Sequence, residues 1–392
     1  MIKHTTKILI SLLASTILMS GCFGIKDKKD NPEHKDHIPL KAQHVFAGHY
    51  ASGIIEPLSS FVLLTGDNTK GQMGLPDKLI LRFMHPMPEP RNISKIILRP
   101  TFSLILTNNN QLYAVGENKW GQFGIGDTKK LDKFQPIAEY VSDVAAGIDF
   151  IAVLRKDGTL MVSGHNNKGQ LGTGDYVDRS IFVIVGHAIT HISAGDQFLL
   201  SINQAGDLLG NGSNEFGQLG MNGRTNIMVP TTIFQQYVLD AAAGPNFSFA
   251  MLGNNVLFVS GNNTRGQLGL GDTIPRKVFT QVPIKLSIKK IALGNQHSIL
   301  LANNGEMLVA GDNHEGQLGF EQPDIQSHFT HGASEVADIA ATANGSIFID
   351  TNNYIYASGS NKKGELGLGY ALSSHGFDKL LDNEEHVHDE RY

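Results

Sequence analysis

The chain has 392 residues, of which 32 are Lys or Arg and 37 are Asp or Glu, giving a formal net charge of −5. This near-neutral balance excludes the strongly basic character typical of nucleic-acid-binding proteins, and it gives no basis for binding to acidic lipids. Glycine is the compositional outlier with 43 residues, which indicates many regularly spaced turns.

Residues 1–22 are typical of an export signal, with lysines at the start and an apolar run over residues 8–19 that is too short to span a bilayer comfortably. The only cysteine, Cys22, directly follows small residues, which resembles the lipobox of bacterial lipoproteins. We therefore predict that Cys22 is lipidated and anchors the protein to the bacterial cell envelope. The outer membrane is favoured over the inner one because Phe23 replaces the Asp that some bacteria use for inner-membrane retention. The alternative is an ordinary cleaved signal and a secreted protein.

Polar segments of mixed charge flank the central part of the chain. Residues 23–43 are rich in Lys and Asp and are expected to form a flexible linker, because they cannot bury a core. Residues 378–392 form an acidic tail that contains histidines and is expected to be disordered. The folded domain is therefore predicted over residues 44–377.

One motif, Gly-x-Asn-x-x-Gly-Gln-apolar-Gly, occurs seven times in this central part. Its copies begin at Gly66 and end with the copy at 359–367, and successive copies start 48 to 50 residues apart. Only the last copy changes a fixed position, where Glu365 replaces glutamine. Such a regular period indicates seven structural repeats.

A shorter motif, Ala-x-Gly or Ala-Gly after an apolar residue, lies before each copy and is followed by two variable residues. The second and seventh copies depart from it, with Arg99-Pro100 and Ala341-Thr342 at the expected Ala-Gly. These departures indicate altered loops in two of the repeats.

Each repeat has the pattern of a small antiparallel sheet. In the third repeat an apolar strand over 151–154 is followed by the turn Asp157-Gly158 and a return strand over 160–163. A sheet of three or four short strands is marginal alone, so the repeats must stack face to face. Seven all-β units of this length predict a seven-bladed β-propeller of about four-stranded antiparallel blades, which closes without a long exposed edge.

The fixed glycines and amides of the long motif are interpreted as structural. Glycine permits backbone angles closed to other residues, and side-chain amides can satisfy backbone groups that no strand reaches. The structural residues assigned in this way are Gly71, Gln72, Gly121, Gln122, Gly169, Gln170, Gly217, Gln218, Gly266, Gln267, Gly316, Gln317 and Gly364.

Together the two motifs resemble the repeats of the regulator of chromosome condensation family. Residues 294–301 and 311–319 form a near-consensus copy, and the resemblance covers about residues 44–375. It implies a seven-bladed propeller of four-stranded blades. The founding member exchanges nucleotide on a nuclear small GTPase and uses an inserted β-wedge; bacterial relatives include an inhibitor of β-lactamases and effectors that act on host GTPases. The nearly uniform spacing here leaves no blade long enough for such a wedge.

Signatures of catalysis are absent from the sequence. There is no phosphate-binding P-loop, no His-Glu-x-x-His zinc motif and no Gly-x-Ser-x-Gly nucleophile elbow. We therefore expect no enzyme activity, no cofactor and no metal site.

Two sets of positions are candidates for contact with a partner. The residue before the second motif glycine is charged in five copies and should face water, so Trp120 and Phe216, which occupy it in the other two, are predicted binding anchors. The alternative is that each aromatic packs on a neighbouring loop. The second set comes from the variable pairs after the short motif, where loops vary on a rigid frame, although relaxed selection would give the same pattern. Its members are His49, Tyr50, Phe102, Asp149, Asp196, Gln197, Asn246, Asn295 and Gln296.

The sequence thus predicts a monomeric, non-catalytic propeller that binds a protein and is exported and lipid-anchored. Rigid, pre-formed loops favour such a role because they lose little entropy on binding. The first alternative is a guanine-nucleotide exchange factor or other regulator of a small GTPase, acting in a host cell. The second is a secreted inhibitor of an envelope enzyme.

Overall fold

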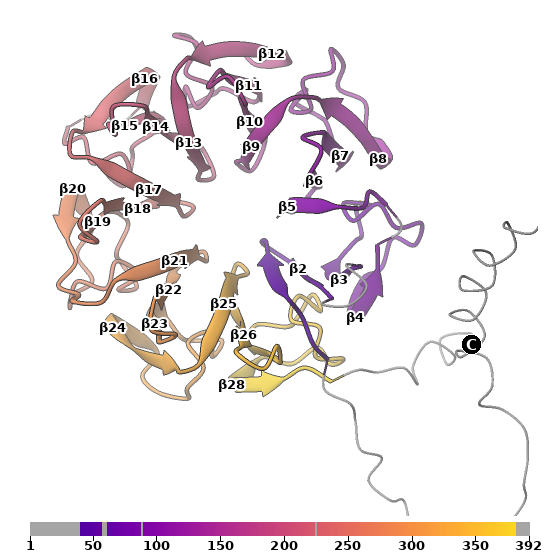
Figure 1. Ribbon diagram of the computed structural model, residues 1–392, viewed down its shortest axis with the longest axis vertical. Coiled ribbons are helices and arrows are strands. Elements are labelled where there is room, and N and C mark those ends of the chain that lie inside the picture. The colour runs from indigo at the N-terminus through magenta and orange to yellow at the C-terminus, as the bar shows by residue number, and fades with distance from the viewer. Residues whose placement is uncertain (1–39, 57–60, 88, 224–225, 382–392) are drawn as a thin grey trace, which may run out of the picture. The chain divides into compact units, whose positions relative to one another are not determined.

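The computed structural model describes residues 40–56, 61–87, 89–223 and 226–381. All 28 elements assigned in these ranges are β-strands. They form seven four-stranded antiparallel sheets, each made of four consecutive strands, and the sheets stand around a common axis as the blades of a ring (Figure 1). The predicted all-β, seven-bladed β-propeller is therefore confirmed. Cys22 and the predicted export signal lie outside the described residues, as do residues 382–392 of the predicted tail.

The blades follow one another in chain order, and the first strand of each lies closest to the axis (Figure 1). The strands are, in blade 1, β1 (His44–Ala47), β2 (Ala51–Ile55), β3 (Val62–Asp67) and β4 (Ile80–Pro86); in blade 2, β5 (Ile93–Leu98), β6 (Phe102–Thr107), β7 (Leu112–Gly116) and β8 (Leu131–Ala138); in blade 3, β9 (Val141–Ala146), β10 (Phe150–Arg155), β11 (Leu160–Gly164) and β12 (Arg179–Gly186); in blade 4, β13 (Ile189–Ala194), β14 (Phe198–Asn203), β15 (Leu208–Ser213) and β16 (Asn226–Phe234); in blade 5, β17 (Val238–Ala243), β18 (Phe247–Leu252), β19 (Leu257–Gly261) and β20 (Arg276–Gln281); in blade 6, β21 (Ile288–Leu293), β22 (His297–Ala302), β23 (Met307–Asp312) and β24 (Ile325–Ala333); and in blade 7, β25 (Val336–Ala341), β26 (Gly345–Asp350), β27 (Ile355–Gly359) and β28 (Ser374–Lys379).

The ring extends beyond both predicted boundaries. The backbone N–H of Leu40 donates to the carbonyl of Leu380 at 3.1 Å, and the N–H of Ala42 donates to Asn353 at 2.9 Å. Ala42 and Leu380 are both buried in the core of the blade 7 to blade 1 junction. Residues 40–43 and 378–381 are thus parts of the propeller, and assigning them to the linker and the tail was wrong.

The hydrophobic core lies in the seams between successive blades. In the seam between blades 2 and 3, Phe102 and Leu104 of β6 pack with Val141 and Val144 of β9. Alternate residues of a second strand pack into the seams on its two sides, as in β10, and the first residue of this strand is a fully buried phenylalanine in blades 2 to 5. Burying one such ring contributes roughly 1.5–3 kcal/mol, so each seam is held chiefly by apolar packing.

The amides of the long motif hold the turn between the third and fourth strands. In all seven copies the motif Asn accepts a hydrogen bond from the backbone N–H five residues later, as Asn118 does from Phe123 at 2.9 Å. The motif Gln accepts one from the residue two positions before it, as Gln122 does from Trp120 at 3.1 Å. Glu365 keeps this bond in the last copy, accepting from the N–H of its own turn at 2.7 Å.

The glycine between these two amides is needed for both conformation and space. Gly121 has a φ of +70°, and a Cβ at this position would lie 2.5 Å from Cα of Ser180 on the next blade. Each motif turn therefore packs directly on the outer strand of the following blade, which is how one repeated turn joins neighbours around the ring.

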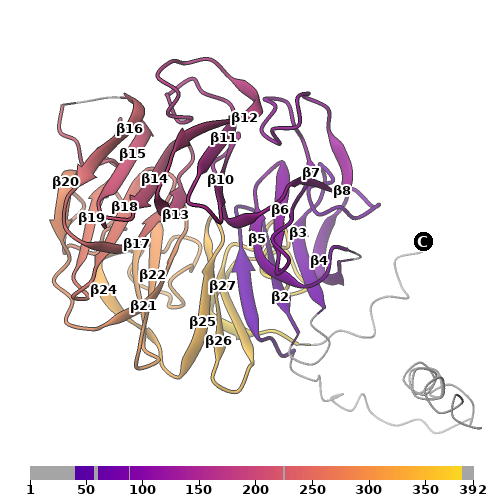
Figure 2. The ribbon, with the colours of Figure 1, turned by 45° about the horizontal axis from the view of Figure 1, so that its top comes forward.

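The alternating strand directions place two sets of loops on the same face of the ring. Figure 2 shows the strands of the blades running between two faces. The upper face, as we call it, carries the loops between first and second strands and the motif turns between third and fourth strands. Backbone hydrogen bonds join the two loops of a blade, as from His165 N–H to the Asp149 carbonyl at 2.9 Å. The lower face carries the turns between second and third strands and the connections to the next blade. Within the described ranges, no helix has the length and apolar character to cross a membrane.

Candidate partner-binding face

The first strands of all seven blades line a central channel with a cavity of about 230 Å³. Small residues dominate its wall, such as Ala145, Ala146 and Ala194, because seven strands converge there. The upper mouth of the channel is formed by the loops that contain His49, Asp196 and Asn295. Three of the residues predicted as partner contacts thus meet at one opening.

A belt of backbone hydrogen bonds links these upper loops from blade to blade. Each N–H of the belt donates to the carbonyl at the same position of the next blade. The bonds of the belt are Ile148 to Asp196 at 3.1 Å, Asp196 to Pro245 at 3.4 Å, Asn295 to Ala343 at 2.8 Å and Ala343 to His49 at 3.1 Å. The belt cannot continue from blade 2 to blade 3 or from blade 5 to blade 6, because Pro100 and Pro245 have no N–H. Among the described residues it is also missing between blades 1 and 2.

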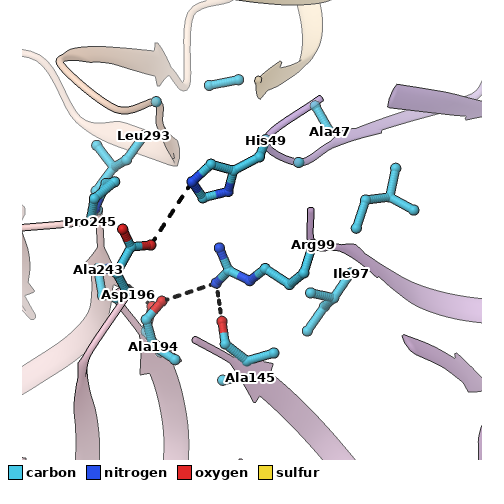
Figure 3. Close-up of a pocket in the computed structure, with 18 of the residues that line it drawn as sticks. Ala47, His49, Ile97, Arg99, Ala145, Ala194, Asp196, Ala243, Pro245 and Leu293 are labelled. Atoms are coloured by element: carbon cyan, nitrogen blue, oxygen red, sulfur yellow. Dashed lines mark hydrogen bonds and ion pairs between the residues drawn. The ribbon is translucent and has the colours of Figure 1, made fainter. Parts of the chain in front are cut away.

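The side chain of Arg99 crosses the channel below this mouth (Figure 3). Its Nη2 donates to the carbonyl of Ala146 in blade 3 and, at 3.4 Å, to the carbonyl of Ala194 in blade 4. Its Nε has no hydrogen-bond partner in the described part of the chain. The side chain of Arg99 therefore links blade 2 to blades 3 and 4, although the backbone belt is interrupted between blades 2 and 3.

His49 and Asp196 face each other across the same mouth (Figure 3). The Nε2 atom of His49 lies 4.0 Å from Oδ1 of Asp196, and this oxygen is buried without a hydrogen-bond partner among the described residues. Burial lowers the pKa of His49, and Arg99 lowers it further, whereas Asp196 acts in the opposite direction. Burial likewise lowers the pKa of the Arg99 guanidinium. The mouth thus holds opposite charges that are close but not fully paired.

Trp120 lies on the upper face beside this mouth and is half-buried. Its ring lies on the ring of His165 from blade 3, with 3.8 Å between centroids. The ammonium of Lys119 lies 4.9 Å from the centroid of the same indole, and the Nδ1 of His165 lies 2.9 Å from the carboxylate of Asp178. We call Trp120, His165 and Lys119 the indole platform.

Asp149 lies next to the indole platform on the upper face, in the loop between β9 and β10. The backbone of Asp149 holds His165, as described above, and burial raises the pKa of its carboxyl group. The charges of His165 and Lys119 lower that pKa, and the charge of Asp196 raises it. The charges of the platform and of the mouth therefore both act on the pKa of the Asp149 carboxyl group.

Phe102 is not part of this face, and its assignment as a partner contact was wrong. It is fully buried in the seam between blades 2 and 3. The N–H of Arg99 bonds to the carbonyl of Phe102 at 2.8 Å, as the N–H of Gly147 bonds to that of Phe150 at 2.9 Å in blade 3. Arg99 thus takes the position of the motif glycine, and the variable pair of blade 2 is Pro100-Thr101.

The other predicted residues all lie on the upper face but do not form one cluster. Phe216 is 42% exposed, and beside it the ammonium of Lys168 pairs with the carboxylate of Glu215. Tyr50 is 38% exposed and meets the His49 ring edge-on, with centroids 6.0 Å apart. The remaining members are half-buried and spread over blades 4 to 6: Gln197, Asn246 and Gln296.

Two residues of the face were missed from the sequence. Arg99 was interpreted only as a departure from the short motif, although a large cation at the position of a channel-lining glycine itself indicates a candidate site residue. His165 gives no such signal, because its stacking on Trp120 depends on how two blades meet. Within the described ranges, no three His, Cys, Asp or Glu side chains gather in a way that could hold a metal ion.

The fold and this face define a β-propeller suited to binding another protein. Two models of the regulator of chromosome condensation (RCC1) repeat match the chain, one over residues 141–170 and 288–317 and the other over residues 205–251 and 254–301. The chain therefore carries RCC1 repeats, as the motifs predicted.

Three solved structures have the same fold as this chain. Yeast RCC1 (Prp20), in its complex with Kap60, is 18% identical and aligns over 92% of this chain and 91% of its own, with a TM-score of 0.75. Prp20p of Saccharomyces cerevisiae, in a study that also describes its binding to Gsp1p and histones, is 17% identical over 88% of this chain and 87% of its own, with a TM-score of 0.73. Human WBSCR16 is 17% identical over 82% and 94%, with a TM-score of 0.72. At these identities the likeness concerns the fold.

Proposed function

We propose that this chain is a non-catalytic interaction propeller that binds a protein partner across its upper face. The observation that carries the proposal is the indole platform beside the channel mouth. Tryptophan is the residue type most enriched at binding hot spots, and this is the only Trp of the chain. Its ring is held in place by His165 at 3.8 Å, so a partner would meet a rigid aromatic surface at little entropic cost.

The charges of the mouth supply specificity for such a partner. Asp196 has a buried oxygen without a hydrogen bond, and Arg99 has a buried Nε in the same condition, both within the described residues. Buried polar atoms without partners are unfavourable until a ligand satisfies them. A partner could cover Trp120 and at the same time place a polar side chain in the mouth, where it would form hydrogen bonds with these buried atoms.

The test is a crosslinking pull-down with the full chain and two pairs of variants. Trp120→Ala and Phe216→Ala should each reduce capture of the partner at least tenfold while leaving the melting temperature within a few degrees. The matched controls are Tyr140→Ala and Tyr237→Ala, which remove exposed aromatics of the lower face that are 64% and 67% exposed. Equal loss of capture in all four variants, or in none, would contradict binding at the upper face.

We further propose that the protein is exported and anchored to the bacterial envelope, favouring the outer membrane, through lipidated Cys22. The support is the sequence pattern of residues 1–22 alone. Metabolic labelling with a tagged fatty acid should mark the natural chain and leave Cys22→Ser unlabelled. Labelling that is unchanged in this variant would show that the chain is not anchored at Cys22.

Regulation of a small GTPase is the second candidate function. It is favoured by the RCC1 repeats of the chain and by the fold shared with Prp20p. Release of labelled guanine nucleotide from a panel of small GTPases should be accelerated if this candidate is right. A well-folded sample that accelerates none of them leaves the interaction propeller without exchange activity, and inhibition of β-lactamases or cell-wall enzymes would then identify an inhibitor.

A further inference from the structure

The seam between blades 1 and 2 contains a second cavity, of about 690 Å³, between the lower halves of β1 and β5. Pockets for small ligands typically have volumes of about 300–1,000 Å³. The cavity opens toward the channel, with which it shares Lys95 and Ile96. It lies apart from the upper face, and the inference below does not depend on the proposed function.

The second strand of blade 1 carries small residues at two positions where the second strand of blade 2 carries large ones. The strand pairings equate Ala51 of β2 with Phe102 of β6 and Gly53 with Leu104. The ring of Phe46 covers Gly53, since a Cβ there would lie 2.5 Å from that ring. The same ring also lines the cavity.

The walls of this seam cavity combine apolar residues with the uncharged polar residues Gln43, Asn92, Ser94 and Asn108, and charged groups complete the lining. The apolar wall is made by Val45, Phe46, Ile55, Ile93 and Ile96. The charged groups at the mouth are His44, Lys95, Lys290 and Asp338.

The lining has two ammonium groups against one carboxylate, an excess of positive charge that favours an anion. The only carboxylate of the lining, Asp338, is already occupied: it pairs with Lys290 at 2.5 Å and accepts from the N–H groups of Val45 at 3.3 Å and Ile339 at 2.9 Å. Lys95 pairs with Asp143, which lies outside the lining, at 2.6 Å. Each ammonium has three donors and uses only some of them, so both lysines have N–H groups left for a ligand.

We propose that the seam cavity binds a small amphipathic carboxylate. Its apolar chain would lie between β1 and β5, and its carboxylate would be held by Lys95 and Lys290, with His44 beside them. An apolar pocket with a few convergent polar groups is the usual design of a small-molecule site, and the charge selects the sign of the head group.

Isothermal titration of the full chain with sodium octanoate tests the proposal, with octylammonium chloride and octanol as probes of the same chain length. We expect one octanoate per chain, bound at least tenfold more tightly than either other probe. Octanol or octylammonium binding as tightly as octanoate would overturn the assignment of the charged mouth. Absence of octanoate binding would overturn the site itself.

Two pairs of variants locate the binding. Ser94→Trp should fill the cavity and reduce octanoate affinity at least tenfold. Ser142→Trp is its control, because Ser142 has the equivalent position in blade 3. The hydroxyl groups of Ser94 and Ser142 each donate to the backbone carbonyl twelve residues further along the chain. Lys95→Gln should weaken binding about fivefold or more, and Lys289→Gln, outside the lining, should not. If Ser94→Trp unfolds, the lysine pair decides. Equal effects within the folded pairs would contradict binding in the seam.

Discussion

His297 is the residue whose replacement we expect to change stability in the most informative way. It stands at the start of β22, where blades 2 to 5 have a fully buried phenylalanine, and it is fully buried too. Its ring packs under Gly294, as the ring of Phe198 packs under Gly195. Neither ring nitrogen forms a hydrogen bond of normal geometry with a described residue. Burial lowers the pKa of His297 to about 4, opposed by Asp312 and by the Gly345 backbone.

This pKa makes the propeller sensitive to mild acid. The unfolded imidazole takes up a proton near pH 6.5 and the folded one near pH 4, so the unfolded chain binds more protons between these values. Stability therefore falls as the pH is lowered through this window. With folded and unfolded pKa values of about 4 and 6.5, the free energy of unfolding should drop by about 2 kcal/mol between pH 7 and pH 5 from this residue alone.

The variant His297→Phe should remove that contribution and stabilise the fold by about 1–3 kcal/mol at pH 7, because two buried polar atoms without partners are lost. Urea unfolding of both proteins at pH 7 and pH 5 measures the two effects. The natural chain should lose about 2 kcal/mol more than the variant over this range. The reasoning is refuted if both proteins show the same change with pH, since the proton would then bind elsewhere.

Three further substitutions test the motif turns and the channel mouth. Glu365→Gln restores the motif amide. Because burial raises the pKa of Glu365 above 4.5, the variant should be more stable in urea at pH 7 and lose this advantage as the pH falls through the raised pKa, with none left below about 4.5; equal stability at pH 7 would count against it. Asn118→Ala removes the acceptor for one turn N–H and a donor to the following loop at 3.0 Å, so the free energy of unfolding should fall by about 1–3 kcal/mol, whereas Asn109→Ala, on an exposed turn, should have little effect. Arg99→Ala should raise the pKa of His49, since the guanidinium lowers it; an NMR titration in which that pKa is unchanged would show that Arg99 does not act on the mouth.

Most of the fold could be predicted from the sequence because one motif repeats with a nearly constant period. The Asn and Gln of the motif form hydrogen bonds within their own turn, so the sequence of each copy determines the conformation of that turn. The boundaries were less predictable: Leu40 and Ala42 are single apolar residues in a polar stretch, and only the distant Leu380 and Asn353 reveal their role.

The candidate site was only partly predictable, for reasons that concern particular residues. Arg99 replaces the glycine of the short motif, so Pro100 was taken for the glycine position. The variable pair of blade 2 was therefore placed one position too late, which included the buried Phe102. The position of Trp120 could be found by comparing copies, but its contact with His165 arises between two blades. The small residues at Ala51 and Gly53 are visible in the sequence, yet only the structure shows that the ring of Phe46 covers Gly53.

No sheet of this ring combines strands from both ends of the chain, since every blade is made of four consecutive strands. Closure instead depends on contacts such as that between Leu40 and Leu380, whose backbones are hydrogen-bonded at 3.1 Å. The two ends of the folded domain are therefore near enough for a short peptide to join them. Any connection between blades could then become a new pair of termini without dividing a sheet, so the blade that comes first along the gene could change while the order of the blades around the axis stays the same.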